Sequence, residues 1–182
     1  MPERLFLIID GSNFYHRMRE LHLVHLLSFD YGEFAQFLRR KNHTIAECCY
    51  YIGLVREDMH DEKSRTLMKN QQKLVSRLQK QGWKVKFGHM LKTNDIYLEK
   101  GVDVQIAVDV VAGAYEDHYD RVVLISSDTD LLPALEKVRA KGKKVTYIGF
   151  SHKPSHALIE HSDVRRLLTR EDLEQFLPKQ ES

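Results

Sequence analysis

The chain has 182 residues, of which 42% are hydrophobic and 30% are charged, and its formal net charge is +2. This balance is that of a folded globular chain, and it excludes both a strongly basic nucleic-acid-binding protein and a disordered one. The length suits one domain with a sizeable core. The two cysteines, Cys48 and Cys49, are adjacent, which suits neither a disulfide framework nor a zinc site and indicates a reducing compartment. With no signal-peptide pattern and no membrane-length apolar run, we expect a cytoplasmic protein without membrane contact.

Strand-like and helical patterns alternate along the chain. Strands are expected over residues 5–9, 47–55, 83–87, 122–125 and 144–148. Helices are expected after residue 13 and over residues 34–38, 62–81, 102–115 and 131–140, with a short last helix that Thr169 opens in capping-box style. A loop is expected at residues 93–95, and residues 152–163 have no clear pattern.

This alternation predicts an α/β fold, with a mostly parallel central sheet and helices on both faces. The result is a three-layer α/β/α sandwich. By the rule for doubly wound sheets we expect the strand order 3-2-1-4-5, with a crevice between the first and fourth strands.

Four aspartates are expected at the carboxyl edge of this sheet. Asp10 follows the first strand, Asp128 and Asp130 follow the fourth, and Asp103 opens the helix that leads to the fourth. Each one alone is explained as well by a helix cap or a helix-dipole contact. Together they require a counter-ion, and oxygen ligands without His or Cys favour Mg²⁺ or Mn²⁺. Asn13 either orients a water or phosphate oxygen in this crevice or caps a helix.

Three motifs carry a resemblance to a known family. They are Asp10-Gly-Ser-Asn13, Lys100-Gly-Val-Asp-Val-Gln-Ile-Ala-Val-Asp109 and Ser126-Ser-Asp-Thr-Asp-Leu-Leu132. In order and spacing they resemble the NYN domain, the LabA-like branch of the PIN-like nuclease superfamily, over roughly residues 5–149. The resemblance implies one PIN-like domain over residues 1–182, with a helical extension over residues 150–182, and metal-dependent cleavage of RNA.

The resemblance also implies the site residues. The metal-site acids are Asp10, Asp103, Asp128 and Asp130, and Asn13 joins them as a candidate catalytic residue. Asp109 matches the second motif, but it lies six residues after Asp103, about 240° round a helix, so the two cannot face one metal. We expect Asp109 to support the site or the fold. The family motif usually has Gly where Ser127 and Thr129 stand, which bears on the geometry of that loop.

An RNA substrate requires basic side chains near the acids. On the helix expected over residues 62–81 they recur every four residues, as Arg65, Lys69, Lys73 and Arg77. A second group of basic residues includes Lys92. Lys100 lies beside the acidic motif, where its positive charge could bind a phosphate or offset the negative charge of the carboxylates. A row of basic side chains along a helix, such as the one expected over residues 62–81, is more often only a solvated helix face.

Three function classes remain open. The first is an endoribonuclease that uses Mg²⁺ or Mn²⁺. The second is an aspartyl-phosphate phosphatase, since Asp128-Thr-Asp130 has the required spacing, although the first motif then has no role. The third is a non-catalytic module that binds RNA or protein and retains the metal site. The oligomeric state stays open, a homo-oligomer included.

Overall fold

The strands form one seven-stranded sheet. The computed structural model describes residues 1–23, 25–55, 62–93 and 96–178, without the side chains of residues 63, 89–93 and 96–99. The strands are β1 (Glu3–Asp10), β2 (His43–Gly53), β3 (Lys84–Thr93), β4 (Ile96–Lys100), β5 (Arg121–Ile125), β6 (Lys144–Phe150) and β7 (Val164–Leu168). Their order is β4-β3-β2-β1-β5-β6-β7. All neighbours are parallel except β3 and β4, which form an antiparallel pair.

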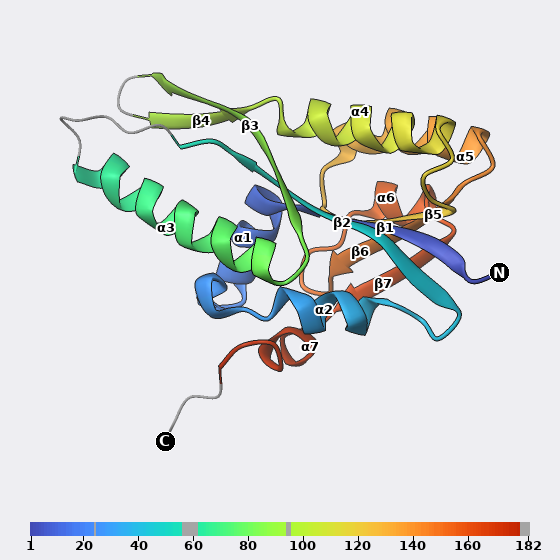
Figure 1. The fold of residues 1–182 in the computed structure, drawn as a ribbon, viewed down its shortest axis with the longest axis horizontal. Helices are drawn as coiled ribbons and strands as arrows, with labels where there is room; N and C mark the ends of the chain where they lie inside the picture. The colour runs from blue at the N-terminus through green and yellow to red at the C-terminus, as the bar shows by residue number, and fades with distance from the viewer. Residues whose placement is uncertain (24, 56–61, 94–95, 179–182) are drawn as a thin grey trace.

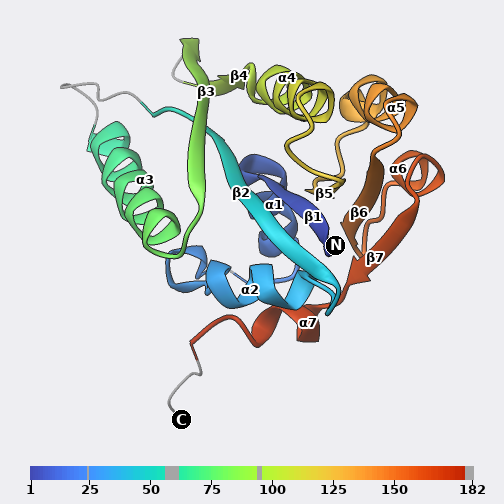
Figure 2. The same cartoon turned by 45° about the vertical axis from the view of Figure 1, so that its right-hand side comes forward.

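Helices cover both faces of this sheet (Figures 1 and 2). The α-helices are α1 (Gly11–Glu20), α2 (Tyr31–Leu38), α3 (Glu62–Lys80), α4 (Val102–Tyr115), α5 (Leu132–Ala140), α6 (His156–Glu160) and α7 (Arg170–Glu174), and two 3₁₀ turns are η1 (Leu26–Ser28) and η2 (Thr129–Leu131). The first three and α7 bury side chains on one face, and α4, α5 and α6 on the other. None of the described helices is long and apolar enough to cross a bilayer.

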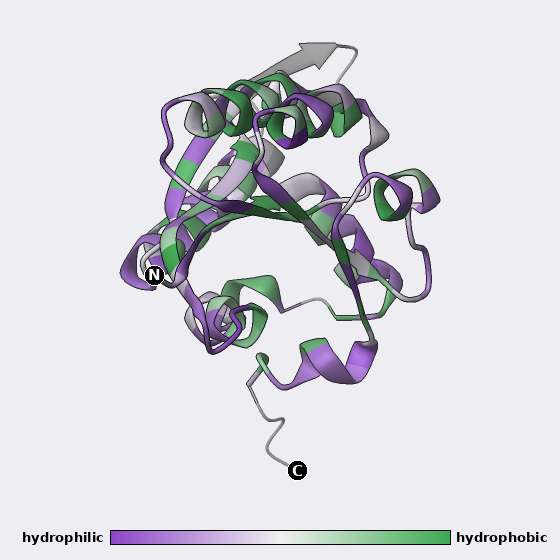
Figure 3. Cartoon of the chain, turned by 90° about the vertical axis from the view of Figure 1, so that its right-hand side faces the viewer, coloured by the Kyte–Doolittle hydropathy of each residue, from purple (hydrophilic) through white to green (hydrophobic). Residues whose placement is uncertain are grey.

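The central strand β1 has a hydrophobic core on each side. Leu5, Leu7 and Ile9 belong to one core, while Phe6 and Ile8 belong to the other. Successive side chains of a strand point to opposite faces, so an unbroken apolar run is the pattern of a strand that is buried on both faces. Figure 3 shows the hydrophobic strands between the two helical layers.

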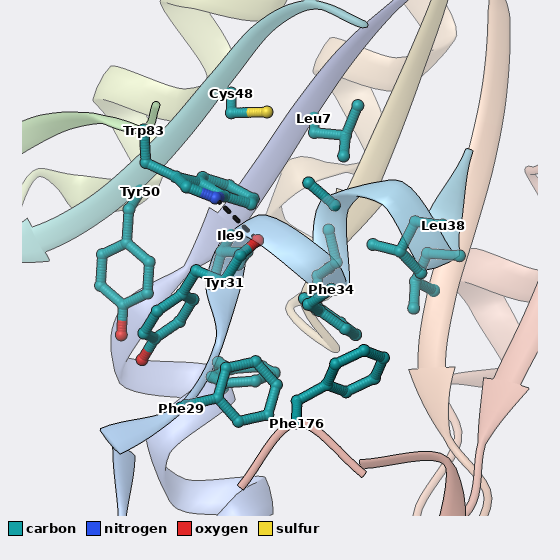
Figure 4. Close-up of a cluster of buried hydrophobic side chains, with 14 of the residues drawn as sticks. Leu7, Ile9, Phe29, Tyr31, Phe34, Leu38, Cys48, Tyr50, Trp83 and Phe176 are labelled. Atoms are coloured by element: carbon teal, nitrogen blue, oxygen red, sulfur yellow. Dashed lines mark hydrogen bonds between the residues drawn. The ribbon is translucent and has the colours of Figure 1, made fainter. Parts of the chain in front are cut away.

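An aromatic cluster holds α1 against the sheet. The ring of Phe14 in α1 lies 5.7 Å from Phe29 and 5.9 Å from Phe34, measured between centroids. Phe176, after α7, contacts Phe29 and Phe34 in the same cluster, and Trp83 Nε1 donates a hydrogen bond to the carbonyl of Tyr31 at 3.0 Å (Figure 4). The helix that begins directly after Asp10 is therefore fixed by a large buried surface.

The expected architecture is confirmed, with two additions. The five expected strands are β1, β2, β3, β5 and β6 in the predicted order, and the helix over residues 102–115 has the predicted bounds. Two strands were missed. Of the loop expected at residues 93–95, Thr93 ends β3, and residues 94–95 lie outside the described part of the chain. The strand β4 then pairs with β3 in the antiparallel direction. The C-terminal segment expected to be a helical extension contributes β7 to the sheet. The capping box of α7 is confirmed, between Thr169 and Asp172.

Candidate functional site at the carboxyl edge of the sheet

Two adjacent parallel strands bring the first and third motifs together. Ile9 of β1 is paired with Ile125 of β5, so Asp10 and Ser126 follow at the same edge. Asp10 is 8% exposed and Ser126 is fully buried. The strand order thus places the Asp10 carboxylate beside the turn that carries Asp128.

Hydrogen bonds connect the two turns. Ser126 Oγ donates to Asp10 Oδ2 at 2.9 Å and accepts from the backbone N–H of Asp128 at 3.1 Å. Asn13 Oδ1 accepts from the backbone N–H of Ser127 at 3.1 Å. These bonds fix Asp10 relative to Asp128, although the two residues are far apart in the sequence.

The two aspartates also cap helices, as the simpler interpretation expected. Asp10 Oδ1 accepts from the backbone N–H of Asn13 at 3.1 Å, and Asp128 Oδ1 accepts from that of Asp130 at 3.0 Å. Asp10 and not Asn13 is the cap of α1. In each aspartate only Oδ1 accepts the capping hydrogen bond. Capping a helix is therefore compatible with a role of the same carboxylate in a site.

Ser126 was not among the expected site residues, whereas its neighbour Ser127 was. Ser126 is the side chain that contacts both motifs, while Ser127 Oγ is buried without a hydrogen-bond partner among the described residues. The signal that could have singled out Ser126 is its place as the first residue after a fully buried strand. This unsatisfied Oγ of Ser127 is suited to a water or a ligand.

Asp103 approaches this edge from α4. Gly101, in the left-handed region at φ 78°, precedes the helix and caps it. A Cβ on Gly88 would lie 2.6 Å from Val102 Cγ2, so the start of α4 packs closely on β3. Asp103 is half-buried in the first turn, and Asp130 is exposed in η2.

Asp109 lies away from the acidic edge and ties α4 to the sheet. Its Oδ2 accepts hydrogen bonds from Tyr51 Oη and Lys86 Nζ, both at 2.7 Å, and Gln105 Nε2 donates to its Oδ1 at 3.0 Å. Burial and the bond to Asp109 both raise the pKa of Tyr51. Burial alone would lower the pKa of Lys86, but the bond to Asp109 raises it overall.

The candidate basic residues fall into separate environments. Arg65, Lys69 and Lys73 are exposed on α3, and Lys100 is exposed at the end of β4. Arg77 differs, because its Nε and Nη2 donate to the carbonyls of Phe29 and Ser28 at 2.8 and 2.9 Å. Its guanidinium therefore anchors the segment around η1. The side chain of Lys92 lies outside the described part of the structure.

A shallow groove of about 510 Å³ follows the exposed face of α3. Its basic lining consists of Lys69, Lys73, Arg77 and Lys80, and no acidic residue is among its described lining residues. Arg65 is outside this lining, and Lys80, which was not among the expected RNA-binding residues, extends the row of basic side chains by about one turn. A groove with one sign of charge attracts polyanions.

The model of the NYN domain matches residues 4–167. The chain belongs to the NYN domain family. This family is part of the PIN-like nuclease superfamily, and the chain has a PIN-like fold. The match does not distinguish the LabA-like branch.

Two proteins without known function are similar to this NYN domain. A crystal structure of a protein of unknown function from Vibrio parahaemolyticus matches with a TM-score of 0.69 and 24% identity, covering 97% of both chains, which is a likeness of fold. An uncharacterized protein of Methanocaldococcus jannaschii is 40% identical over 48 residues, which are 26% of this chain and 20% of that protein. The chain thus matches about a fifth of the length of that relative.

The metal site expected from four carboxylates stays a prediction. Within the described residues, no three Asp, Glu, His or Cys side chains form a group that could hold a metal ion. Like charges repel each other without a counter-ion, and Asp10 and Asp128 are satisfied by local hydrogen bonds instead. The donor chemistry still fits Mg²⁺ or Mn²⁺, which bind through one or two carboxylates and keep several waters. The unsatisfied Ser127 Oγ adds one more oxygen.

A thermal melt tests this fit. A divalent ion at about ten times its dissociation constant would stabilise the fold by about 1.4 kcal/mol, which raises the Tm of a protein of this size by roughly 3–6 °C. We expect this rise with Mg²⁺ or Mn²⁺, and we expect Asp128→Asn to reduce it. Asp120→Asn, at the opposite end of β5, is the matched control and should retain it. If neither metal changed the Tm of wild type, the aspartates at this edge would be stabilising the fold and not binding a metal.

Proposed function

We propose that this NYN domain is an endoribonuclease that hydrolyses RNA phosphodiester bonds with Mg²⁺ or Mn²⁺. The observation that carries the proposal is the bridge between Asp10 and Asp128 through Ser126 Oγ at the carboxyl edge of β1 and β5. Sites of open α/β sheets form at this edge. The bridge joins the first and third motifs at one edge of the sheet, within the part of the chain that matches the family.

Asp10 and Asp128 would hold the ion, and Asp103 and Asp130 would complete its surroundings. When bound, such an ion neutralises phosphate charge and lowers the pKa of a water. The hydrogen bond from Ser126 keeps the Asp10 carboxylate oriented and leaves little freedom to lose on binding. Asn13 fixes the facing turn through its oxygen, and the exposed Lys100 is available to a phosphate.

Cleavage assays test the proposal against its alternatives. Single-stranded and structured RNAs are incubated with Mg²⁺, Mn²⁺ or EDTA, alongside a small phosphomonoester. We expect RNA fragments with at least one of the metals, none with EDTA, and an intact phosphomonoester. Phosphomonoester hydrolysis without RNA cleavage would indicate the phosphatase. RNA binding without cleavage would indicate the non-catalytic module.

The basic groove makes a separate prediction about RNA affinity. Lys69→Ala with Lys73→Ala should weaken binding and reduce the slope of log affinity against log salt by about 1.4, since each lysine on a single strand contributes about 0.7. Cleavage of saturating RNA should continue. Filter binding across a salt series measures this, with Lys137→Ala plus Lys141→Ala in the other helical layer as the control. If the α3 variant kept the wild-type slope, the groove would be an ordinary solvated surface.

A further inference from the structure

A second pocket opens beside the acidic edge. It measures about 360 Å³ and lies between α1, η1, the end of β2 and α3. Gly11 and Ser12, the two residues after Asp10, form part of its wall. This volume is at the lower end of the range of about 300–1,000 Å³ found for small-ligand sites. The pocket is therefore large enough for a ligand group, and its wall includes the two residues that follow Asp10.

The lining of this pocket is apolar and aromatic. Tyr15, Leu27 and Leu67 line it although they are 43%, 39% and 38% exposed. Tyr50 forms part of the buried wall. None of its described lining residues is charged, and Asn70 is an exposed polar group among them. Exposed apolar side chains gathered at one pocket mark a binding site.

The charge around the pocket identifies the kind of ligand. Leu27 lines both this pocket and the basic groove on α3, so the two adjoin at this side chain. Lys69, in the groove, is the neighbour of Asn70 in the pocket. Tyr15 of the pocket lining is itself close to a cation, since the guanidinium carbon of Arg19 lies 5.7 Å from the centroid of its ring. An uncharged apolar slot beside basic side chains is complementary to a base on a phosphate chain.

We propose that this pocket, which Tyr15, Leu27 and Leu67 open to solvent, binds one unpaired nucleobase of an RNA strand. The phosphate chain of that strand runs between the α3 groove and Asp10. This inference rests on the proposed function and adds a base-binding subsite to it. A base enters the pocket with its faces against apolar side chains, and Asn70 offers hydrogen bonds to its edge. A base that is paired in a duplex cannot enter.

Equilibrium binding in EDTA tests the subsite without cleavage. The probes are a labelled oligouridylate, the same ribose-phosphate chain with abasic nucleotides, and the oligouridylate annealed to its complement. Stacking one base contributes about 1–3 kcal/mol, so we expect wild type to bind the oligouridylate at least about fivefold more tightly than the abasic chain. The annealed probe should bind more weakly than the single strand.

Variants locate the effect. Leu67→Trp narrows the pocket and Tyr15→Ala removes its exposed aromatic ring, and each should reduce the preference for the oligouridylate over the abasic chain. Tyr15→Ala is needed because an indole at position 67 could itself stack on a base. Val108→Trp, at a 55% exposed position of α4, should retain the preference. Lys69→Ala with Lys73→Ala should weaken both probes and leave their ratio unchanged.

The outcomes separate the subsite from the nuclease. Equal affinity of wild type for the two single-stranded probes, or full preference in both pocket variants, would overturn the subsite. If the oligouridylate were still cleaved with Mn²⁺ in that case, the proposed function would stand without it. If wild type bound none of the probes, the subsite and the proposed RNA substrate would both fail.

Discussion

Asp10→Asn is expected to lower the single-turnover rate of RNA cleavage at least about 100-fold while RNA binding is retained. The substitution keeps the size of a side chain that is 8% exposed and removes the charge that would hold the divalent ion. Losing one such electrostatic contact costs about 10²–10³ in rate, and a lost metal costs several kcal/mol of transition-state stabilisation. Single-turnover cleavage with Mg²⁺ and Mn²⁺ measures the effect.

The control for Asp10→Asn is an aspartate at the other end of β5. Asp120 precedes this strand, and its hydrogen bonds with the Arg4 side chain lower its pKa to about 2. Asp120→Asn should therefore leave cleavage at the wild-type rate while losing contacts to Arg4. Equal losses of cleavage in the two variants would point to general destabilisation and not to the acidic edge.

Gly11→Ala is expected to destabilise the fold by roughly 1–3 kcal/mol, the usual cost of overpacking. A Cβ at this position would lie 2.4 Å from Tyr50 Cε1 and 2.6 Å from the backbone oxygen of Tyr51. Tyr50 is buried, and the carbonyl belongs to β2, so neither can move freely. The steric conflict outweighs the gain of at most about 1 kcal/mol from replacing Gly by Ala in a helix. Urea unfolding measures the difference.

Gly32→Ala is the matched control for this substitution. Gly32 lies in α2, and its added Cβ would be 3.4 Å from Asp30 Oδ1, an ordinary contact. We expect this variant to be as stable as wild type or slightly more so. Wild-type stability of Gly11→Ala would mean that β2 can withdraw from the start of α1, which contradicts the close packing described here.

Most of the fold was predictable because its strands have strong local signals. The fully apolar run of β5, between Arg121 and Ser126, predicts a central parallel strand. The edge strand β7 gives a weak signal, since Arg165 and Arg166 interrupt its apolar residues. The strand β4 was missed because it is defined by its antiparallel pairing with β3. No local sequence pattern predicted this pairing.

The site was predictable in its position and less so in its contacts. The ends of neighbouring parallel strands necessarily meet, so Asp10 and Asp128 could be assigned to one edge. The sequence does not specify which small side chain bridges them, because Ser126 and Ser127 are identical residues and only the backbone turn separates their roles. The subsite lined by Tyr15, Leu27 and Leu67 comes from three elements and has no sequence pattern of its own.

Single-turnover cleavage measured beside filter binding, for wild type and Asp128→Asn, tests the central claim most directly. Asp128→Asn removes a negative charge from the proposed metal site, so RNA affinity should stay the same or rise. Cleavage by wild type should require Mg²⁺ or Mn²⁺ and should be lost in Asp128→Asn. Wild type that binds RNA but cuts none with either metal, across varied sequences and structures, would contradict the nuclease. Asp128→Asn that cuts at the wild-type rate would contradict the site.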